Sequence, residues 1–423
     1  MTTDDSGGLT RRTFLKGSAA AAAVAGVGTF GVFTEANGET IGPDQVINAA
    51  FIGTGSQGCY DLDRACKVPN VKFVACCDIQ EKNLARGLGI AKGAQGYKDY
   101  REVLARKDIQ AVLIATPIGL HAAIAVEALK SGKHVFCEKM MAYTIDDAKR
   151  MLRASRDSGR KLQIGHQRRY DVGYQHAYKL VKDGVLGKIT HVRAQWNRNG
   201  SWRRPCPDSK LDWLINWRLY RKSSQGLMAE LGSHQIDVVN WMLGETPSAV
   251  VGMGGLDYYK DGRDVFDNVQ VIFEYPSGVR FQYQSLTTNQ YDGFTEQFMG
   301  DKGTLIIYPN KALLFPEPKA EQLAWADVAH KEKEGGKEAI VLDASKSPRL
   351  AHQNTQGTDV AGAKSAKDDY YLEMEDFFKS LRDGHEPFCN ARVALDTCIA
   401  AIKANEAMES KKRMAIPPEV YKC

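Results

Sequence analysis

The chain has 423 residues, which predicts two domains once a targeting segment is set aside. Its hydrophobic content of 43% and charged content of 25% are ordinary for a globular enzyme. The net charge of +5 is mild and no lysine- or arginine-rich block stands out, so nucleic acid is not an implied partner. The nine cysteines show neither a paired framework spacing nor a C-x-x-C pair, which argues against a disulfide scaffold and against a zinc or iron–sulfur site.

Residues 1–36 are expected to be a twin-arginine (Tat) signal segment and no part of the fold. Arg11 and Arg12 precede a weakly apolar Ala/Gly stretch over 17–33, which is short and weak for a stable membrane span. Residues 34–36 match a cleavage site only loosely, so an uncleaved, anchored form is left open. The segment predicts export by the Tat machinery, to the periplasm or otherwise out of the cytoplasm, by a route that carries folded proteins.

A glycine-rich turn organises the rest of the chain. The apolar run 47–52 leads into G-x-G-x-x-G, after which a helical pattern begins. In such a turn the glycines permit the bend, the approach of a pyrophosphate and close helix–strand packing, while N–H groups at the helix start hold the anion. The residues predicted to bind the cofactor here are Gly53, Gly55, Ser56, Gln57 and Gly58.

Asp78 supports this interpretation. It ends the apolar run 71–77, twenty residues beyond Gly58, where a ribose-binding carboxylate belongs. The alternative is a solvated residue that caps the next helix. A carboxylate here would repel a 2′-phosphate, so NAD is favoured over NADP.

Apolar strands and helical stretches alternate as far as residue 165, which predicts a Rossmann domain over 37–165 with a doubly wound parallel sheet. Beyond it, period-two strands and a hairpin signal at 276–278 predict an α+β substrate or oligomerisation domain over 166–385, with a large, mostly antiparallel open sheet. Within that domain the polar segment 316–366 is expected to be a long surface loop or insertion. Residues 386–423 are expected to form a C-terminal helix and tail.

Several motifs resemble one family in its order. A-T-P-I-G-L-H with G-K-H-V-F-C-E-K (115–139), then E-L-G-S-H-Q-I-D (230–237) and a closing helix from Asn390, are similar to the motifs of the glucose–fructose oxidoreductase/inositol dehydrogenase (Gfo/Idh/MocA) family. Two positions depart from the pattern: Met140 stands where the family usually has proline, and Glu230 where it has aspartate.

The resemblance implies roles for individual residues. The catalytic set is Lys139 and His234, with Glu230 as the positioning carboxylate; the same spacing is compatible with zinc, but the family generally needs no metal. Implied cofactor contacts, beyond the glycine turn and Asp78, are Thr116, Pro117, His121, Glu138, Lys139 and Gln167.

Two stretches are expected to meet the substrate: G-H-Q-R-R-Y-D (165–171) and W-N-R-N-G-S-W-R-R-P (196–205). Aromatic rings stack on sugar C–H faces, while Arg and Asn bind hydroxyls or a carboxylate; the alternative for the second stretch is a solvated loop with structural tryptophans. The candidate substrate-binding residues are Arg169, Tyr170, Asn197, Trp202, Arg203 and Asp237.

The leading hypothesis is an exported NAD(P)-dependent oxidoreductase that transfers hydride between a carbohydrate hydroxyl and a tightly bound nicotinamide, since no NAD pool recycles the cofactor outside the cytoplasm. One alternative is a redox-neutral, NAD-dependent glycosidase, which the presence of the Glu138–Lys139 pair disfavours. The other is a non-catalytic sugar-binding protein, which the presence of Lys139 and His234 disfavours. A homo-oligomer is expected because open sheets of this kind tend to pack on a partner.

Overall fold

The computed structural model describes residues 40–42, 44–206, 208–309, 311–321, 330–342 and 368–423. The expected signal segment 1–36 lies outside the described residues, as does part of the polar segment 316–366. Residues 38–423 cluster into one compact unit.

The first sheet has six parallel strands, in the order β3-β2-β1-β4-β5-β6. The strands are β1 (Ile47–Ile52), β2 (Val71–Cys77), β3 (Gln95–Tyr97), β4 (Ala111–Ile114), β5 (His134–Glu138) and β6 (Leu162–Gly165). The chain order reverses between β1 and β4, the crevice where doubly wound sheets bind ligands at the carboxyl ends of their strands. The structure confirms the predicted Rossmann sheet.

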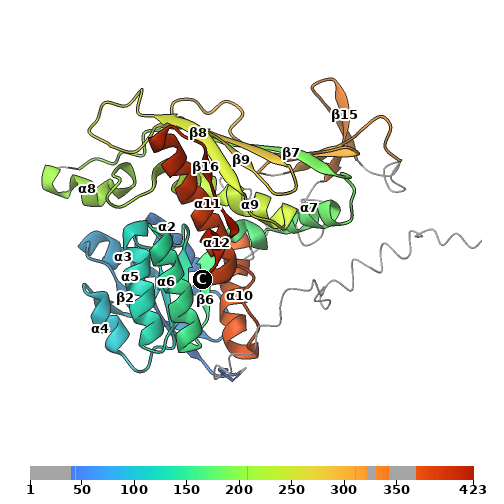
Figure 1. The fold of residues 1–423 in the computed structure, drawn as a ribbon. Helices are drawn as coiled ribbons and strands as arrows, with labels where there is room; N and C mark the ends of the chain where they lie inside the picture. The colour runs from blue at the N-terminus through green and yellow to red at the C-terminus, as the bar shows by residue number, and fades with distance from the viewer. Residues whose placement is uncertain (1–39, 43, 207, 310, 322–329, 343–367) are drawn as a thin grey trace, which may run out of the picture. The chain divides into compact units, whose positions relative to one another are not determined.

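Helices cover both faces of this sheet (Figure 1). They are α2 (Ser56–Ala65), α3 (Glu81–Ile90), α4 (Tyr100–Ala105), α5 (Ile118–Lys130), α6 (Ile145–Ser158) and α10 (Asp369–Asp383). Successive side chains of strand β1 point to opposite faces of the sheet and pack in both helix layers. Ala50 and Ile52 pack on the side of α5 and α6, whereas Ile47 and Phe51 pack with α2, α3 and α10. All four side chains are at least 97% buried, so β1 is a central strand of the core.

Helix α10 corrects one expectation. Its residues fall in the range expected for the second domain, yet Phe377 and Phe378 pack against the first sheet. The Phe377 ring centroid lies 6.0 Å from that of Phe136 on β5, and the Phe378 centroid lies 6.4 Å from that of Phe73 on β2. The chain therefore returns near its end to complete the nucleotide domain.

The second sheet has ten strands, in the order β14-β15-β13-β12-β11-β7-β10-β9-β8-β16. Its strands are β7 (Ile189–Asn197), β8 (Ala249–Gly255), β9 (Asn268–Glu274), β10 (Arg280–Leu286), β11 (Phe294–Gly300), β12 (Gly303–Ile307), β13 (Ala312–Pro316), β14 (Lys331–Glu334), β15 (Lys337–Leu342) and β16 (Met414–Ala415). Only β7 and β10 pair in parallel; the other neighbours pair antiparallel, as expected of a mostly antiparallel sheet.

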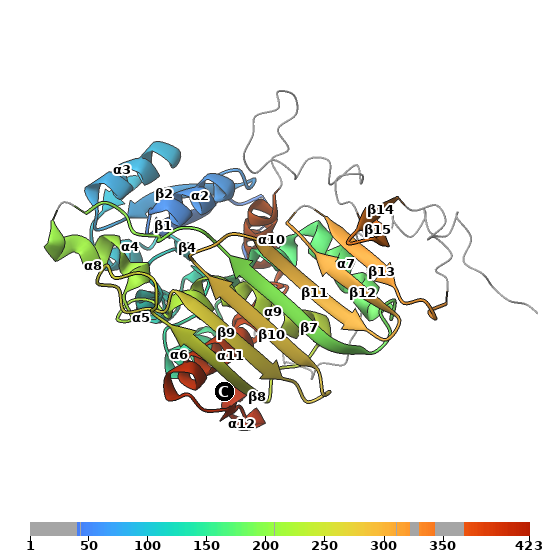
Figure 2. The ribbon, with the colours of Figure 1, turned by 90° about the horizontal axis from the view of Figure 1, so that it is seen from above.

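Helices line one face of this sheet and lie behind it in Figure 2. They are α7 (Val172–Lys182), α9 (Ser233–Leu243) and α11 (Ala391–Ser410), and two short helices complete the fold, α8 (Asp212–Ile215) and α12 (Pro418–Tyr421). Helix α11 contacts both α6 and β8, so its buried residues join the two sheets through one continuous core. Asn390 fixes the start of α11 by accepting hydrogen bonds from the backbone N–H groups of Arg392 and Val393 at 3.0 and 3.2 Å.

A second expectation needs correction in the polar segment 316–366. It was expected to be a long surface loop, but its described part contains the hairpin of β14 and β15, which extends the sheet beyond β13. Ala339 and Val341 of β15 pack with Leu313 in a small separate cluster. Short runs such as K-E-A-I-V-L carry a weak strand signal among so many charged neighbours, which is why composition alone suggested a loop.

Candidate functional site

A cavity of about 470 Å³ lies where the first sheet meets the loops of the second. Its wall includes Ser56 and Gln57 after β1, Glu138 and Lys139 at the end of β5, and Gln167 after β6. The carboxyl ends of parallel strands meet at one edge, so segments far apart in sequence converge here. The remaining lining residues are Trp196, Arg198, Trp202, Arg203, Arg204, Ile215, Asn216, Trp217, Arg218, Glu230, Leu231, His234 and Tyr370.

The three glycines of the turn have different steric roles. Gly53 has φ +93°, and an added Cβ would lie 2.5 Å from the carbonyl oxygen of Ala115; at Gly58 a Cβ would lie 1.9 Å from the carbonyl oxygen of Gly53. At Gly55, by contrast, a Cβ would meet nothing within 4 Å. Glycine is thus required by the fold at two positions, while at the third it keeps a space free.

That free space adjoins the start of α2. Gly55 is the N-cap of the helix and provides no side-chain cap, and the first turn has no acidic residue. The first N–H groups of a helix need an acceptor, and the helix dipole favours an anion there. The turn therefore fits the pyrophosphate of a dinucleotide.

Asp78 lies at the end of β2, as expected. One carboxylate oxygen accepts from the backbone N–H of Thr54 at 2.9 Å and the other from that of Gln80 at 2.8 Å. Burial raises its pKa above the ordinary value of 3.8, against the effect of these hydrogen bonds. Asp78 thus ties the end of β2 to the glycine turn.

The motif after β4 has a structural role in this structure. Pro117 is the N-cap of α5. The His121 ring lies between two backbone carbonyls: Nε2 is 2.9 Å from the oxygen of Thr116 and Nδ1 is 3.0 Å from that of Met140. Burial lowers the pKa of His121. His121, expected as a cofactor contact, instead links the β4–α5 turn to the segment after Lys139, and neither it nor Thr116 nor Pro117 lines the cavity.

Lys139 and Glu230 lie together. The Lys139 ammonium donates to the backbone carbonyl of Glu230 at 2.9 Å, and the carboxylate of Glu138 accepts the backbone N–H of Lys139 at 3.0 Å. The Lys139–Met140 peptide is cis, at the position where the family usually has proline. Burial lowers the pKa of Lys139 and raises that of Glu138 to about 7.

Glu230 is held by residues that the sequence analysis did not single out. One carboxylate oxygen accepts from Arg218 Nε at 2.9 Å and the other from Ser224 Oγ at 3.1 Å. Glu230 lies in a π-helical turn, Met228–Gly232, immediately before α9. Such turns are often found at functional sites, because the wider turn redirects side chains.

His234, on the first turn of α9, faces the same cavity. Its Nδ1 is buried without a hydrogen-bond partner among the described residues, and its ring lies 5.5 Å from that of Trp196 and 6.3 Å from that of His166. Burial, with the neighbouring Lys139, lowers the pKa of His234 well below 6.5, so the ring is neutral, with one nitrogen as donor and the other as acceptor.

Asp237 and Arg169 do not line the cavity, contrary to expectation. They form a buried two-point ion pair, Nε–Oδ2 at 2.8 Å and Nη2–Oδ1 at 2.9 Å, to which Thr397 donates from α11. Tyr170 donates to Asp376 at 2.9 Å and likewise lies outside the lining. The π turn at Met228–Gly232 changes the angular spacing between Glu230 and Asp237, so the two residues do not share one helical face.

The stretch 196–205 follows β7 and contributes most of the second wall. Trp202 lines the cavity with φ +59°, a strained conformation for a bulky residue. Arg203 lines it too, but its guanidinium is committed to Asp212 at 2.9 and 3.0 Å and to Asp261 at 2.8 Å. Asn197 instead donates to the carbonyl of Tyr291 at 3.1 Å and is not a lining residue.

Other lining residues were missed by the sequence analysis. Arg198 and Arg204 lie in the stretch 196–205 but are not among the substrate-binding residues expected from it. Trp217 and Arg218 stand in no recognisable motif. Tyr370 lies on α10 and accepts a hydrogen bond from Gln167 Nε2 at 2.9 Å. Its separation of 203 residues from Gln167 leaves no local pattern to find.

Buried carboxyl groups lie behind Glu138. Asp61 accepts from Gln57 Nε2 at 2.8 Å, and both carboxylate oxygens of Glu373 are buried without a hydrogen-bond partner among the described residues. Burial, and then the charge of Glu138, raises the pKa of both groups well above ordinary values. These two carboxyls therefore favour their protonated forms.

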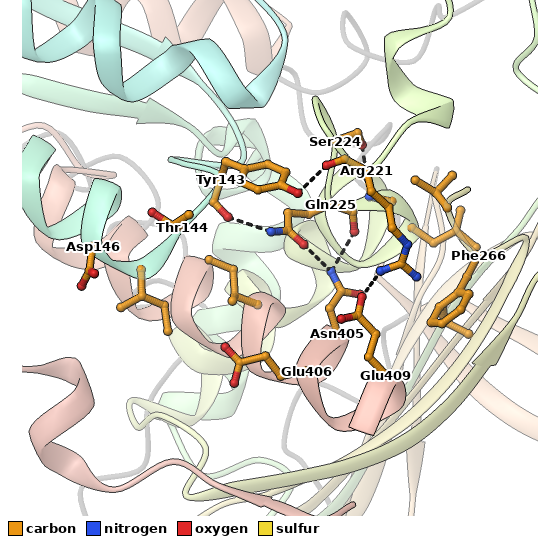
Figure 3. Close-up of a pocket in the computed structure, with 16 residues that line it drawn as sticks. Tyr143, Thr144, Asp146, Arg221, Ser224, Gln225, Phe266, Asn405, Glu406 and Glu409 are labelled. Atoms are coloured by element: carbon orange, nitrogen blue, oxygen red, sulfur yellow. Dashed lines mark hydrogen bonds and ion pairs between the residues drawn. The ribbon is translucent and has the colours of Figure 1, made fainter. Parts of the chain in front are cut away.

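A second cavity, of about 500 Å³, is lined by Ser224 together with residues of α11 and the segment before α6 (Figure 3). Gln225 donates to the carbonyl of Tyr143 at 2.7 Å, and Asn405 on α11 donates to the carbonyl of Gln225 at 2.8 Å. Arg221 forms an ion pair with Glu409 across this cavity. Ser224 lines it while also holding Glu230, so the cavity adjoins the support of the candidate site.

The described part of the chain contains no group of three or more His, Cys, Asp or Glu side chains placed to hold a metal ion. None of its helices is both long enough and apolar enough to cross a membrane.

Three family models match the chain. The oxidoreductase family with an NAD-binding Rossmann fold matches residues 47–166, and the GFO/IDH/MocA C-terminal domain matches residues 174–306. The twin-arginine translocation pathway signal matches residues 8–28, outside the described residues.

Curated relatives share about a third of their aligned residues with this chain. Inositol 2-dehydrogenase of Salmonella typhimurium is 32% identical over 203 residues, which cover 47% of this chain and 55% of that protein. The 2,7-anhydro-N-acetylneuraminate hydratase of Escherichia coli is 30% identical over 238 residues, 55% of this chain and 60% of the relative. The chain thus spans little more than half the length of these relatives.

Solved structures share the fold at lower identity. A levoglucosan dehydrogenase in complex with NADH and levoglucosan has a TM-score of 0.72 at 20% identity, covering 88% of this chain and 100% of the other. An aldose–aldose oxidoreductase from Caulobacter crescentus has a TM-score of 0.67 at 21% identity, over the same shares of the two chains. At these identities the likeness extends to the fold.

Proposed function

Since the chain belongs to the Gfo/Idh/MocA family of oxidoreductases, with an NAD-binding Rossmann domain and a twin-arginine signal, we propose that it is an exported enzyme that transfers hydride between a carbohydrate hydroxyl and a nicotinamide that it holds tightly. The observation that carries the proposal is the convergence of Lys139, Glu230 and His234 on the cavity that also contains the glycine turn. A sugar-binding protein without catalysis would have no need of this convergence.

The chain's own groups fit the cofactor. The uncapped start of α2 and the free space at Gly55 suit a pyrophosphate, and Asp78 at the end of β2 suits the ribose hydroxyls. The Asp78 carboxylate would repel a 2′-phosphate, so we propose NAD over NADP. When bound, nicotinamide accepts or returns a hydride at its ring carbon 4.

Lys139 supplies the acid and base. During oxidation the hydroxyl proton passes to the neutral Lys139 amine as the C–H hydride leaves; during reduction the ammonium returns that proton. Burial lowers the pKa of Lys139 below 10.5, which increases the neutral fraction near physiological pH. The Glu230 carbonyl orients Nζ, and the Arg218 and Ser224 contacts hold Glu230 in place.

His234 holds the substrate oxygen from a second direction. Because its ring lines the cavity and is neutral, it can donate to or accept from the reacting hydroxyl without adding charge. Trp196 packs beside it and Trp202 and Trp217 line the wall, so aromatic faces are available for the C–H faces of a sugar ring.

Arg204 supports tight retention of the cofactor. It belongs to the loop that follows β7 of the second sheet, yet its Nη2 lies 3.4 Å from Ser56 Oγ at the glycine turn. Arg86 on α3 donates to the carbonyl of Gly55 at 3.1 Å. Burial, then the charges of Arg218 and Arg86, lowers the pKa of Arg204, so a bound anion would offset the repulsion among these cations.

The proposal is tested on the mature chain, purified without added nucleotide. Denaturation should release about one NAD per chain, identified by mass, and Lys139→Met should keep that NAD while turnover falls about 100- to 10,000-fold. Lys107→Met, an exposed lysine outside the cavity, should change neither. A wild-type protein that binds neither NAD nor NADP, before or after their addition, would refute the proposal.

The anhydro-sugar hydratase among the relatives keeps a redox-neutral reaction as the second candidate. In that scheme a hydroxyl is oxidised, an aglycone is eliminated, water adds and the ketone is reduced. Cleavage of aryl glycosides with retained NAD and no net NADH would identify it, whereas retained NAD without cleavage supports sugar–sugar oxidoreduction.

We also propose a homo-oligomer that packs through the face of the open sheet away from α9 and α11. Val251, Met253 and Ile272 on β8 and β9 are 42%, 80% and 45% exposed. Sedimentation of the mature chain, with Met253→Asp as the variant, tests this: the variant should sediment as a smaller species.

A further inference from the structure

We propose that the substrate carries an anionic group and that Arg198 binds it; this rests on the proposed function and deepens it. Arg198 was not among the substrate-binding residues expected from the sequence. Arg198 lines the same cavity as Lys139, Glu230 and His234.

Cationic side chains outnumber carboxylates in the cavity lining. Five lining residues are cationic, Lys139, Arg198, Arg203, Arg204 and Arg218, whereas the lining carboxylates are Glu138 and Glu230. A site for neutral sugars gains nothing from such an excess, because cations that face a cavity without partners repel one another.

Carboxylates already compensate some of these cations. Arg218 pairs with Glu230 at 2.9 Å, and Arg203 pairs with Asp212 and Asp261. Burial lowers the pKa of Lys139, and the negative charges of Glu230 and then Glu138 oppose that effect. Arg204 lies at the glycine turn and is assigned to the cofactor phosphates.

Arg198 and Arg204 are then the two lining cations without a carboxylate partner among the described residues, and Arg198 is the one that is not assigned to the cofactor. Within the described residues no carboxylate pairs with it, and none of its side-chain N–H groups donates to another residue. Partial burial, together with Arg218, lowers its pKa from 12.5, as expected when desolvation and a like charge act on an uncompensated cation. An anion bound here would offset both the desolvation of the Arg198 charge and its repulsion by Arg218.

The geometry around Arg198 is fixed. Its backbone N–H donates to the carbonyl of Leu286 at 2.8 Å, which anchors it at the end of β7. Its guanidinium carbon lies 5.5 Å from the ring centroid of Trp202, the residue in the strained left-handed conformation. Stacking on an aromatic face leaves the edge of the guanidinium free, which is the edge that binds a carboxylate or phosphate by two parallel hydrogen bonds.

The ligand class is therefore a sugar that bears a carboxylate or a phosphate. Trp196, Trp202 and Trp217 provide faces for the ring, His234 and Lys139 lie where the reacting hydroxyl would be, and Arg198 fixes the charged end. Carboxylate and phosphate share this recognition chemistry, so the experiment has an arm for each.

Quenching of tryptophan fluorescence in the NAD-loaded protein provides a binding assay that does not depend on turnover. The probes are glucuronate and galacturonate for the carboxylate arm, glucose 6-phosphate for the phosphate arm, and glucose and galactose as neutral sugars. We expect one anionic arm to bind more tightly than its neutral parent, by about 10-fold or more. We expect salt to weaken that binding.

The decisive variant is Arg198→Gln, with Arg198→Lys as the charge-conserving form. Arg198→Gln should weaken binding of the anionic sugar about 10- to 100-fold and change that of the neutral sugar less than about 2-fold, while Arg198→Lys recovers part of the loss. Arg193→Gln is the matched control, because Arg193 is an exposed arginine on β7, the strand that ends immediately before Arg198, and it does not line the cavity.

Equal losses for anionic and neutral sugars, or tighter binding of neutral sugars by the wild type, would overturn the inference. Failure of the proposed function has a different signature. If Arg198→Gln selectively loses anion binding but the wild type transfers no hydride to or from any bound sugar, the anion site stands and the hydride transfer does not.

Discussion

The substitution Gly55→Ala separates the demands of the fold from those of the cofactor. Gly55 has φ −65° and ψ −162°, which alanine adopts without strain, and the added Cβ would meet no protein atom within 4 Å. Lower entropy of the unfolded chain favours alanine by about 0.4–1 kcal/mol. The poorer N-cap offsets this by about the same amount. The free energy of unfolding without nucleotide should therefore change by less than about 0.5 kcal/mol.

The same methyl group would occupy the space proposed for the pyrophosphate. Overpacking of a close contact costs about 1–3 kcal/mol, so NAD affinity should fall about 5- to 150-fold. The assay has two parts: thermal unfolding of the nucleotide-free protein, in which the midpoint should move by less than about 2 °C, and NAD titration by calorimetry.

Gly58→Ala is the contrasting variant. Its Cβ would lie 1.9 Å from a backbone oxygen, so the nucleotide-free protein itself should be destabilised. The reasoning would be refuted if Gly55→Ala bound NAD with unchanged affinity, or if it unfolded as readily as Gly58→Ala.

Four further outcomes follow from the structure. Arg169→Met should cost about 3–5 kcal/mol of stability in chemical unfolding, because it leaves Asp237 buried without its partner, and the double variant with Asp237→Leu should recover much of the loss; a double variant no more stable than the single one would contradict this. Burial, then Glu138, raises the pKa of Glu373, so its stabilising contribution is complete below the unfolded-state pKa and is lost as pH rises through the folded-state pKa. Glu373→Gln should therefore unfold at a higher temperature than the wild type at pH 8 but not at pH 5, and a pH-independent difference would disprove the assignment. Oxidation of substrate should accelerate with pH through the lowered pKa of Lys139 while reduction slows, and the same trend in both directions would exclude Lys139 as the proton carrier. Arg204→Gln should release NAD on dialysis, most strongly at high salt, with Arg193→Gln retaining it; equal retention would remove Arg204 from the cofactor site.

The sequence was most informative where a short motif and a periodic pattern coincide. The glycine turn, Asp78 and Lys139 each follow a strongly patterned strand, so their place at the edge of the first sheet could be predicted, whereas His234 begins a patterned helix, α9. The Rossmann sheet and the open sheet follow from the change between helix-interrupted strands and period-two strands.

Other features depend on contacts between distant segments. Arg169 and Asp237 were expected to face the substrate because both stand in motifs, but a buried ion pair between them satisfies both charges. The π turn at Met228–Gly232 has no recognisable pattern of its own. The uncompensated charge of Arg198 becomes visible only when the partners of the other arginines are known.

The position of α10 has a consequence for biosynthesis. The hydrophobic face that contains Phe51, Phe73 and Phe136 is closed by Tyr371, Met374, Phe377 and Phe378, which the ribosome adds only near the end of translation. Until then a nascent chain presents the twin-arginine segment together with an uncovered apolar sheet. A transport route that accepts only folded proteins would reject this intermediate, so we expect α10 to pack on the first sheet before any transport by the twin-arginine route. Truncation before residue 369 should thus leave a precursor that chaperones bind and the export machinery refuses.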